Sequence, residues 1–242
     1  MDFPGDINGP KFSEGDIVSF TLPEAELTMR LPVVADYKMT DRVSSMRDLT
    51  NIDTSGWEHF GDDGFCFSEL AVQSWTYEDL DTHDNVADCL LIITILKHGK
   101  SESDSLFSLN SQTFREQQIT WLAEDLSDED RPGWPSKEND FFAQTIKGDI
   151  LDGLQVQIET VKNAGRNFPD IYALFSLGKY FTVGIEYSLM SLHYPDRKNP
   201  YSEEFLQDLK FKTFDDFLSH IHIEYTPETI ALIEQRTKEL SA

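Results

Sequence analysis

The densest group of side chains that could do chemistry is the segment Glu78–Asn85, in which four of the eight residues are acidic: Glu78, Asp79, Asp81 and Asp84. Closely spaced carboxylates suit calcium, but a calcium loop of the EF-hand type needs a glycine at its sharp turn and a glutamate at its twelfth position. The segment has no glycine, and the twelfth residue counted from Asp79 is Leu90. We therefore predict a solvated acidic loop here and no calcium site.

A second candidate for metal chemistry is the group His220, His222 and Glu224. Residues two apart lie on different faces of a helix, whereas they share a face on an extended segment. No further clear ligand accompanies them, and histidines also suit the end of a helix, where a positive charge stabilises the C-terminal dipole. We predict a helix end here, with no metal ion and no other cofactor.

Motifs that would identify an enzyme do not occur in the sequence. It contains neither phosphate-binding glycine loop, and it lacks the HExxH and GxSxG motifs. Asp53-Thr54-Ser55-Gly56 differs from an aspartic-protease loop by an inserted serine, and no second copy supplies the partner carboxylate that such enzymes need. We predict no catalytic residues; a hydrolase whose carboxylates meet only in the folded chain is the alternative.

The strongest compositional feature is the stretch from Asp48 to Leu96, which has eleven acidic residues and no lysine or arginine. Aromatic and aliphatic residues alternate with these acids, so the stretch is able to bury apolar surface, which a disordered acidic tail cannot do. It ends in the apolar run Cys89–Leu96. The pattern predicts a folded, sheet-like element with one strongly negative face.

Charge is also uneven along the chain. The formal net charge is −24, with −19 carried by residues 1–130 and −5 by residues 131–242. A field of this sign repels nucleic acid and anionic membranes, and it attracts a basic protein partner. The plain alternative is that the charge only keeps the protein soluble.

Partner-binding residues are expected among the acids of this stretch and the aromatic side chains between them. Large aromatic anchors surrounded by charge are typical of tight interfaces, although each aromatic residue could instead belong to the core. The candidate partner-binding residues are Asp62, Asp63, Trp75, Tyr77, Glu78, Asp79, Asp81 and Asp84.

The order of predicted elements favours an α+β fold with mainly antiparallel sheets. In each half the helices follow the strands, and we expect the C-terminal helices to pack on the sheet. The proline- and glycine-containing segment 127–140 is the best candidate linker, so the division is an acidic lobe at 1–126 and a second lobe at 141–242, which could also pack as one domain. A duplication of one ancestral half stays open.

Several elements are expected at particular residues. Val86–Leu96 is apolar on both faces, which predicts a central strand, and Asp152-Gly153 predicts the turn of a hairpin. Helical spacing predicts a helix over Ser111–Leu126, and capping signals predict helix starts at Thr213 and Thr226. The imperfect alternation after Phe65 indicates a β-bulge.

The two cysteines, Cys66 and Cys89, lie in apolar runs without a CxxC spacing or a neighbouring histidine, so we predict two small buried side chains and neither zinc nor redox chemistry. Their pairing in a disulfide stays open. The N-terminal residues do not have the basic and apolar regions of a signal peptide, and no apolar run is long enough to span a membrane. We expect a cytoplasmic protein.

In its length, acidity, α+β pattern and lack of catalytic motifs, the chain resembles the immunity proteins of bacterial toxin systems, including those paired with type VI secretion effectors. The resemblance implies a protein that inhibits a basic toxin, for example a nuclease effector, by covering its active surface. A secretion chaperone or adaptor is the rival function, and it would need an exposed apolar groove instead of a charged patch. The identity of the partner and the oligomeric state stay open.

Overall fold

The computed structural model describes residues 7–32, 41–51, 54–60, 65–98, 106–126, 141–158, 170–191 and 201–242. Asp53, Asp62, Asp63 and the proposed linker 127–140 lie outside the described residues.

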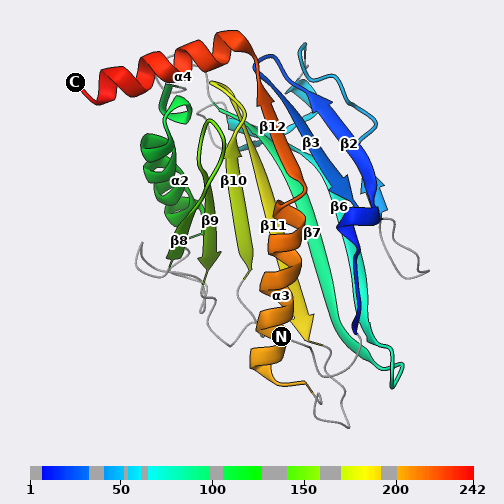
Figure 1. Ribbon diagram of the computed structural model, residues 1–242. Helices are drawn as coiled ribbons and strands as arrows, with labels where there is room; N and C mark the ends of the chain where they lie inside the picture. Colours follow the sequence, from blue (N-terminus) through cyan, green and yellow to red (C-terminus); the bar gives the residue numbers. More distant parts are fainter. Residues whose placement is uncertain are drawn as a thin grey trace.

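A nine-stranded antiparallel sheet forms the body of the molecule (Figure 1). Its main path runs β1-β6-β7-β11-β10-β9-β8, and β4 and β5 both pair with β6. The strands are β1 (Ile7–Asn8), β4 (Asp41–Val43), β5 (Glu58–Phe60), β6 (Phe65–Asp79), β7 (Asn85–Lys97), β8 (Phe141–Ile146), β9 (Gly153–Ile158), β10 (Ile171–Ser176) and β11 (Phe181–Ser191). The predicted α+β fold with antiparallel sheets is confirmed.

The two halves of the chain share this sheet. Strand β7 of the first half pairs with β11 of the second half along the whole register from Phe181↔Lys97 to Ser191↔Ala87. Each strand also has a neighbour from its own half, because β7 pairs with β6 and β11 with β10. The described parts of the two halves therefore pack as one unit and not as separate lobes.

Strands β6 and β7 are the longest pair, and their burial follows from their sequences. The predicted strand at Val86–Leu96 is confirmed as most of β7, which alternates fully buried and partly buried residues. Its pairing with β6 shifts register between Glu69 and Ala71, as the predicted bulge requires, and again between Tyr77 and Glu78.

A second, three-stranded sheet lies against one face of the main sheet, here called the front face (Figure 1). Its order is β12-β3-β2, with strands β2 (Asp16–Thr21), β3 (Ala25–Leu31) and β12 (Ile221–Tyr225). The prediction of a helix end holds for His220, which directly follows the C-cap Ser219, but it is wrong for His222, because β12 pairs with β3 from Ile221↔Met29 to Tyr225↔Ala25. This pairing ties the C-terminal part of the chain to its N-terminal hairpin.

Three α-helices are described: α2 (Ser111–Leu126), α3 (Glu203–Leu218) and α4 (Pro227–Leu240), with short 3-10 turns at η1 (Phe12–Glu14), η2 (Thr54–Gly56) and η3 (Leu106–Leu109). The predictions at Ser111–Leu126 and at the Thr226 cap are confirmed. The predicted helix start at Thr213 is wrong, because Ser202 caps one continuous helix through that position by accepting from the backbone N–H of Phe205.

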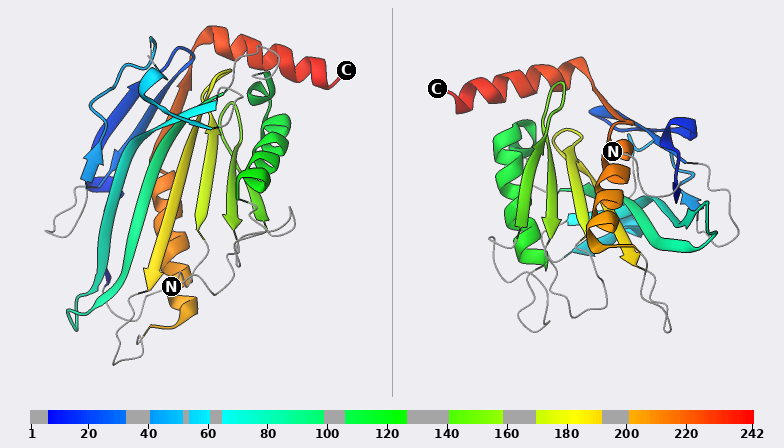
Figure 2. Two further views of the ribbon diagram at one scale, coloured as in Figure 1. Left: turned by 180° about the vertical axis from the view of Figure 1, so that it is seen from behind. Right: turned by 60° about the horizontal axis from the view of Figure 1, so that its bottom comes forward.

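The helices cover the two faces of the main sheet unequally. On the front face, α3 contributes Phe214 and Phe217 to the large core between the two sheets. On the opposite face, here called the back face, Phe114 of α2 packs against Leu154 and Leu174. This second, smaller core lies only at the β8–β10 end of the sheet, and the view from behind shows β6 and β7 without a described helix over them (Figure 2).

The turn between β10 and β11 fixes the hairpin β2–β3 to the main sheet. Gly178 has a φ of 121°, a conformation that side chains other than glycine rarely adopt. The Glu24 carboxylate packs against Gly178 and accepts a hydrogen bond from the backbone N–H of Lys179 at 2.5 Å. Cys66 and Cys89 are both buried, as predicted. Both are free thiols, so they do not form the disulfide that the sequence had left open.

Within the described part of the chain, no helix has the length and apolar character needed to cross a membrane.

Burial of His98, the residue that follows β7, makes the stability of the fold depend on pH. The imidazole is buried and shares a hydrogen bond with the hydroxyl of Thr182, and burial lowers the pKa of His98 to about 4. Between pH 6.5 and pH 4 the unfolded chain therefore binds a proton that the folded chain does not, and folding is destabilised as the pH falls. A pKa difference of one unit corresponds to about 1.36 kcal/mol. We therefore expect His98 to lower the free energy of unfolding by about 3 kcal/mol between pH 6.5 and pH 4.

The matched variant is His98→Gln, which keeps a polar group near Thr182 and removes the titration. Denaturant unfolding at pH 7 and pH 4.5 should show a smaller loss of unfolding free energy for this variant than for the wild type. An equal loss in both proteins would contradict the assignment to His98.

Candidate functional site

The back face of β6, β7 and β11 presents rows of side chains that the strand registers align. One row is Thr76, Asp88 and Met190, and the next begins with Ser74 and Leu90. Strand alternation sends all five to the side opposite the main core. The rows combine hydroxyl, carboxylate and apolar groups on one uncovered stretch of sheet.

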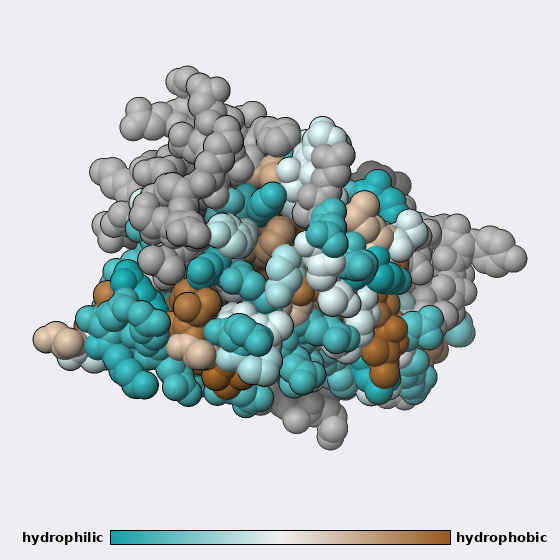
Figure 3. Space-filling view, turned by 90° about the horizontal axis from the view of Figure 1, so that it is seen from above, coloured by the Kyte–Doolittle hydropathy of each residue, from teal (hydrophilic) through white to brown (hydrophobic). Residues whose placement is uncertain are grey.

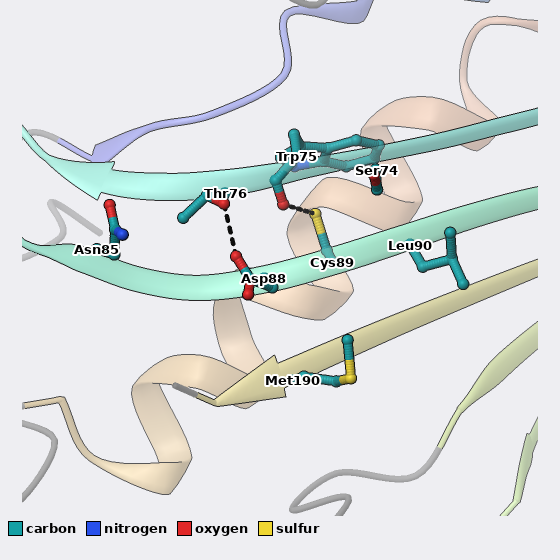
Figure 4. Close-up of a pocket in the computed structure, with 8 residues that line it drawn as sticks. All are labelled: Ser74, Trp75, Thr76, Asn85, Asp88, Cys89, Leu90 and Met190. Atoms are coloured by element: carbon teal, nitrogen blue, oxygen red, sulfur yellow. Dashed lines mark hydrogen bonds between the residues drawn. The ribbon is translucent and has the colours of Figure 1, made fainter. Parts of the chain in front are cut away.

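A pocket of about 510 Å³ is formed on these rows (Figure 4). This volume lies in the range of about 300–1,000 Å³ that is typical of ligand sites. The side chains of Trp75 and Cys89 are buried on the front face, so these two residues line the pocket with their main chain. The lining residues are Ser74, Trp75, Thr76, Asn85, Asp88, Cys89, Leu90 and Met190.

Among the described residues that line the pocket, Asp88 is the one that carries a charge. Its Oδ1 accepts a hydrogen bond from the Thr76 hydroxyl at 2.5 Å, which fixes the carboxylate against β6. Within the described part of the chain its Oδ2 has no hydrogen-bond partner, and Figure 4 shows this oxygen turned away from Thr76. Met190 is 43% exposed and lies opposite Asp88 on β11, so an apolar wall stands beside an available carboxylate.

The acidic loop predicted at Glu78–Asn85 contains the last two residues of β6, the turn of residues 80–84 that joins β6 to β7, and the first residue of β7. Asp81 and Asp84 are exposed there, whereas Glu78 is half-buried and pairs with His83 at 3.1 Å. The first half of α3 adds three exposed acids at the same end of the molecule: Glu203, Glu204 and Asp208. We call these exposed acids, Asp81, Asp84, Glu203, Glu204 and Asp208, the acidic end.

Asp79, one of the candidate partner-binding residues, is buried and has a structural role in the turn. It is only 6% exposed, and its Oδ1 accepts from the backbone N–H groups of Asp81 and Thr82. The hydroxyl of Tyr201 donates to its Oδ2. Together with the backbone bonds, this Tyr201 contact lowers the pKa of Asp79, which keeps it ionised as the anchor between the turn and α3.

Trp75 and Tyr77, two further candidate partner-binding residues, lie in the core. They are 5% and 2% exposed, and the Trp75 ring stacks on Tyr187 with a centroid distance of 5.9 Å. The Tyr77 hydroxyl lies 2.9 Å from that of Tyr187 and donates to Thr213 of α3 at 2.6 Å. Burial raises the pKa of Tyr77, so this network stays neutral and serves packing.

The candidates for metal chemistry are not brought together. Among the residues that the structure describes, no group of three or more His, Cys, Asp or Glu side chains could hold a metal ion. His220 lies 3.7 Å from Asp216 of the preceding helix, whereas His222 is exposed on β12.

Of the candidate binding residues, the structure thus leaves Asp81 and Asp84 free, keeps Glu78 in a local pair, and buries Trp75, Tyr77 and Asp79. Asp62 and Asp63 are outside the described residues. Sequence reasoning missed the pocket itself. The alternation of Ser74, Thr76 and Asp88 with buried neighbours signals a polar face on β6 and β7, but the position of Met190 depends on pairing between distant strands.

Comparison with models of known protein families finds no match, and comparisons with curated proteins and with solved structures likewise find no similar protein.

Proposed function

We propose that this chain is a non-enzymatic binding protein that neutralises a basic protein partner, in the manner of an immunity protein that covers the active surface of a bacterial toxin. The single observation that carries the proposal is the gathering of exposed acids at one end of the molecule, next to an uncovered sheet face with a pocket. Residues 65–96 and 201–209, which contain these acids, include no lysine or arginine.

The two parts of this surface, the acidic end and the back face, have different physical roles. Exposed charges in water contribute little affinity by themselves, but their combined field raises the rate at which an oppositely charged protein arrives. The apolar side chains of the back face, which include the half-buried Leu90 and the exposed Met190, supply the contact that slows dissociation. A basic nuclease fits this surface, because an enzyme that binds phosphate carries the complementary charge.

The rival function, a secretion chaperone, is less well supported by the surface. The large hydrophobic side chains that are exposed in the described residues come from separate elements: Ile17, Met46, Leu80, Phe142, Ile150, Met190 and Leu240. The view from above likewise shows small hydrophobic areas separated by hydrophilic ones (Figure 3). A chaperone for an apolar segment needs a continuous groove instead.

Capture of the partner tests the proposal. The wild-type chain and an Asp81→Lys, Asp84→Lys variant are immobilised and incubated with extract of the source organism. We expect a protein of basic isoelectric point that only the wild type retains, and whose toxicity in a bacterial host is relieved by co-expression of the wild-type chain. Retention of the same protein by both baits, or relief of toxicity by both, would contradict a charge-guided inhibitor.

A further inference from the structure

The pocket on the back face places a carboxylate beside the apolar side chains of Leu90 and Met190, which is an arrangement that suits a long cationic side chain. Across the strands, Thr76 lies on one side of Asp88 and Met190 on the other. Leu90 follows Asp88 on the same face of β7, two residues along. A side chain that enters here meets carbon at its stem and negative charge at its tip.

We propose that this pocket takes an arginine side chain of the basic partner, with the guanidinium group on Asp88 and the aliphatic stem against Leu90 and Met190. The inference rests on the proposed function, and it names the chemical group of the partner that the face recognises.

Charge and shape both favour a guanidinium group. The Thr76 hydroxyl binds one oxygen of Asp88 and holds the carboxylate in place, and the other oxygen is available. A planar guanidinium has five N–H donors and pairs with a carboxylate through two of them, so it has donors left for neighbouring oxygens. Ser74 and Asn85 are further polar residues of the pocket lining. A lysine ammonium is more strongly hydrated and lacks the matching fork.

The apolar walls strengthen such a contact. Lysine and arginine side chains commonly bury their methylene groups on apolar surface while the charged head stays with a polar partner. Here the stem covers Leu90 and the exposed Met190, and it displaces water from around Asp88. Lower local solvation makes a charge pair stronger than the same pair on an open surface.

A blocked tripeptide, acetyl-Gly-Arg-Gly-amide, is the probe. The chain has five methionines, so methyl NMR gives a short spectrum in which Met190 is assigned from the Met190→Leu variant. We expect the arginine peptide to shift the Met190 methyl signal in a saturable manner. The same peptide with citrulline, which has the shape of arginine without its charge, should bind at least about tenfold more weakly, and the lysine peptide should bind more weakly than the arginine peptide.

Three variants with the same change in net charge test the role of Asp88. Asp88→Asn removes the charge in the pocket but keeps an acceptor for Thr76, and Met190→Lys places an ammonium group directly opposite Asp88. Asp149→Asn removes a charge from the exposed turn between β8 and β9, outside both the pocket and the acidic end. The first two should weaken the arginine peptide at least about tenfold, whereas Asp149→Asn should leave it within about twofold. Because Met190→Lys removes the reporter methyl, peptide binding to all three is followed by backbone amide signals of β6 and β7.

Equal binding of the citrulline peptide, or unchanged arginine binding by Asp88→Asn with a native-like spectrum, would overturn the arginine pocket. The proposed function would then still stand if the captured basic protein depends on Asp81 and Asp84. Conversely, the arginine peptide could bind as expected while capture of the basic protein does not depend on Asp81 and Asp84. That result would refute the charge-guided inhibitor but leave the assignment of the pocket intact.

Discussion

Replacement of Trp75 by alanine is expected to lower the free energy of unfolding by about 3–5 kcal/mol, the range for removal of a large aromatic side chain from a packed core. Trp75 is 5% exposed and its ring contacts three others: it stacks on Tyr187 and meets Phe12 and Tyr77 edge to face. These contacts join β6, β11 and η1, so the cavity would open where several elements meet. Denaturant unfolding measures the change.

Phe142→Ala is the matched control, since it removes an aromatic side chain that is 58% exposed on the edge strand β8. Its cost should stay below about 1 kcal/mol. Under conditions in which Trp75→Ala remains folded, its affinity for the captured partner should equal that of the wild type. If Trp75→Ala instead had the stability of the wild type but bound the partner more weakly, Trp75 would belong to the binding surface.

Reversal of charge at the acidic end should have the largest effect on partner capture. Asp81→Lys with Asp84→Lys changes the formal net charge from −24 to −20, and both side chains are exposed and outside the core. We expect the association rate constant with the captured partner to fall about tenfold or more, with little change in the dissociation rate. Stopped-flow or surface-binding kinetics at low salt measures both.

A double reversal at the opposite end of the sheet controls for net charge. Glu26 lies near the start of β3 and Asp149 in the turn between β8 and β9, and both are exposed. The variant Glu26→Lys, Asp149→Lys has the same net charge as the first variant but leaves the acidic end unchanged (Figure 1). If both variants slow association equally, total charge and not its placement is responsible.

Local sequence pattern predicted most of the strands and two of the three described helices. The apolar run at Cys89–Leu96 predicted β7, and the Asp152-Gly153 signal predicted the β8–β9 hairpin, since each signal is confined to neighbouring residues. The position of the turn differs from the prediction, because residues 147–152 connect the strands and Gly153 already pairs with Ile146. The alternation across His220–Ile223 was interpreted as a helix end because an acceptable helix lies directly before it. Its strand form depends on pairing with β3, near the other end of the sequence.

The burial of the candidate site residues was harder to predict from the sequence. Trp75 and Tyr77 alternate with polar Ser74 and Thr76, so the pattern separates two faces of β6 but does not tell which one is covered. Coverage by α3 and the second sheet decides that the aromatic face is the core. The burial of Asp79 could not be predicted for a similar reason, because its partner Tyr201 comes from a distant part of the chain.

The ionic-strength dependence of association with the captured partner tests the central claim most directly. Exposed charges are screened over about 10 Å at 0.1 M salt and about 3 Å at 1 M. If the acidic end guides a basic partner to this surface, the wild-type association rate constant should fall about tenfold or more between 0.02 M and 0.5 M salt while dissociation changes little. An association rate constant that is the same across that range would contradict the account.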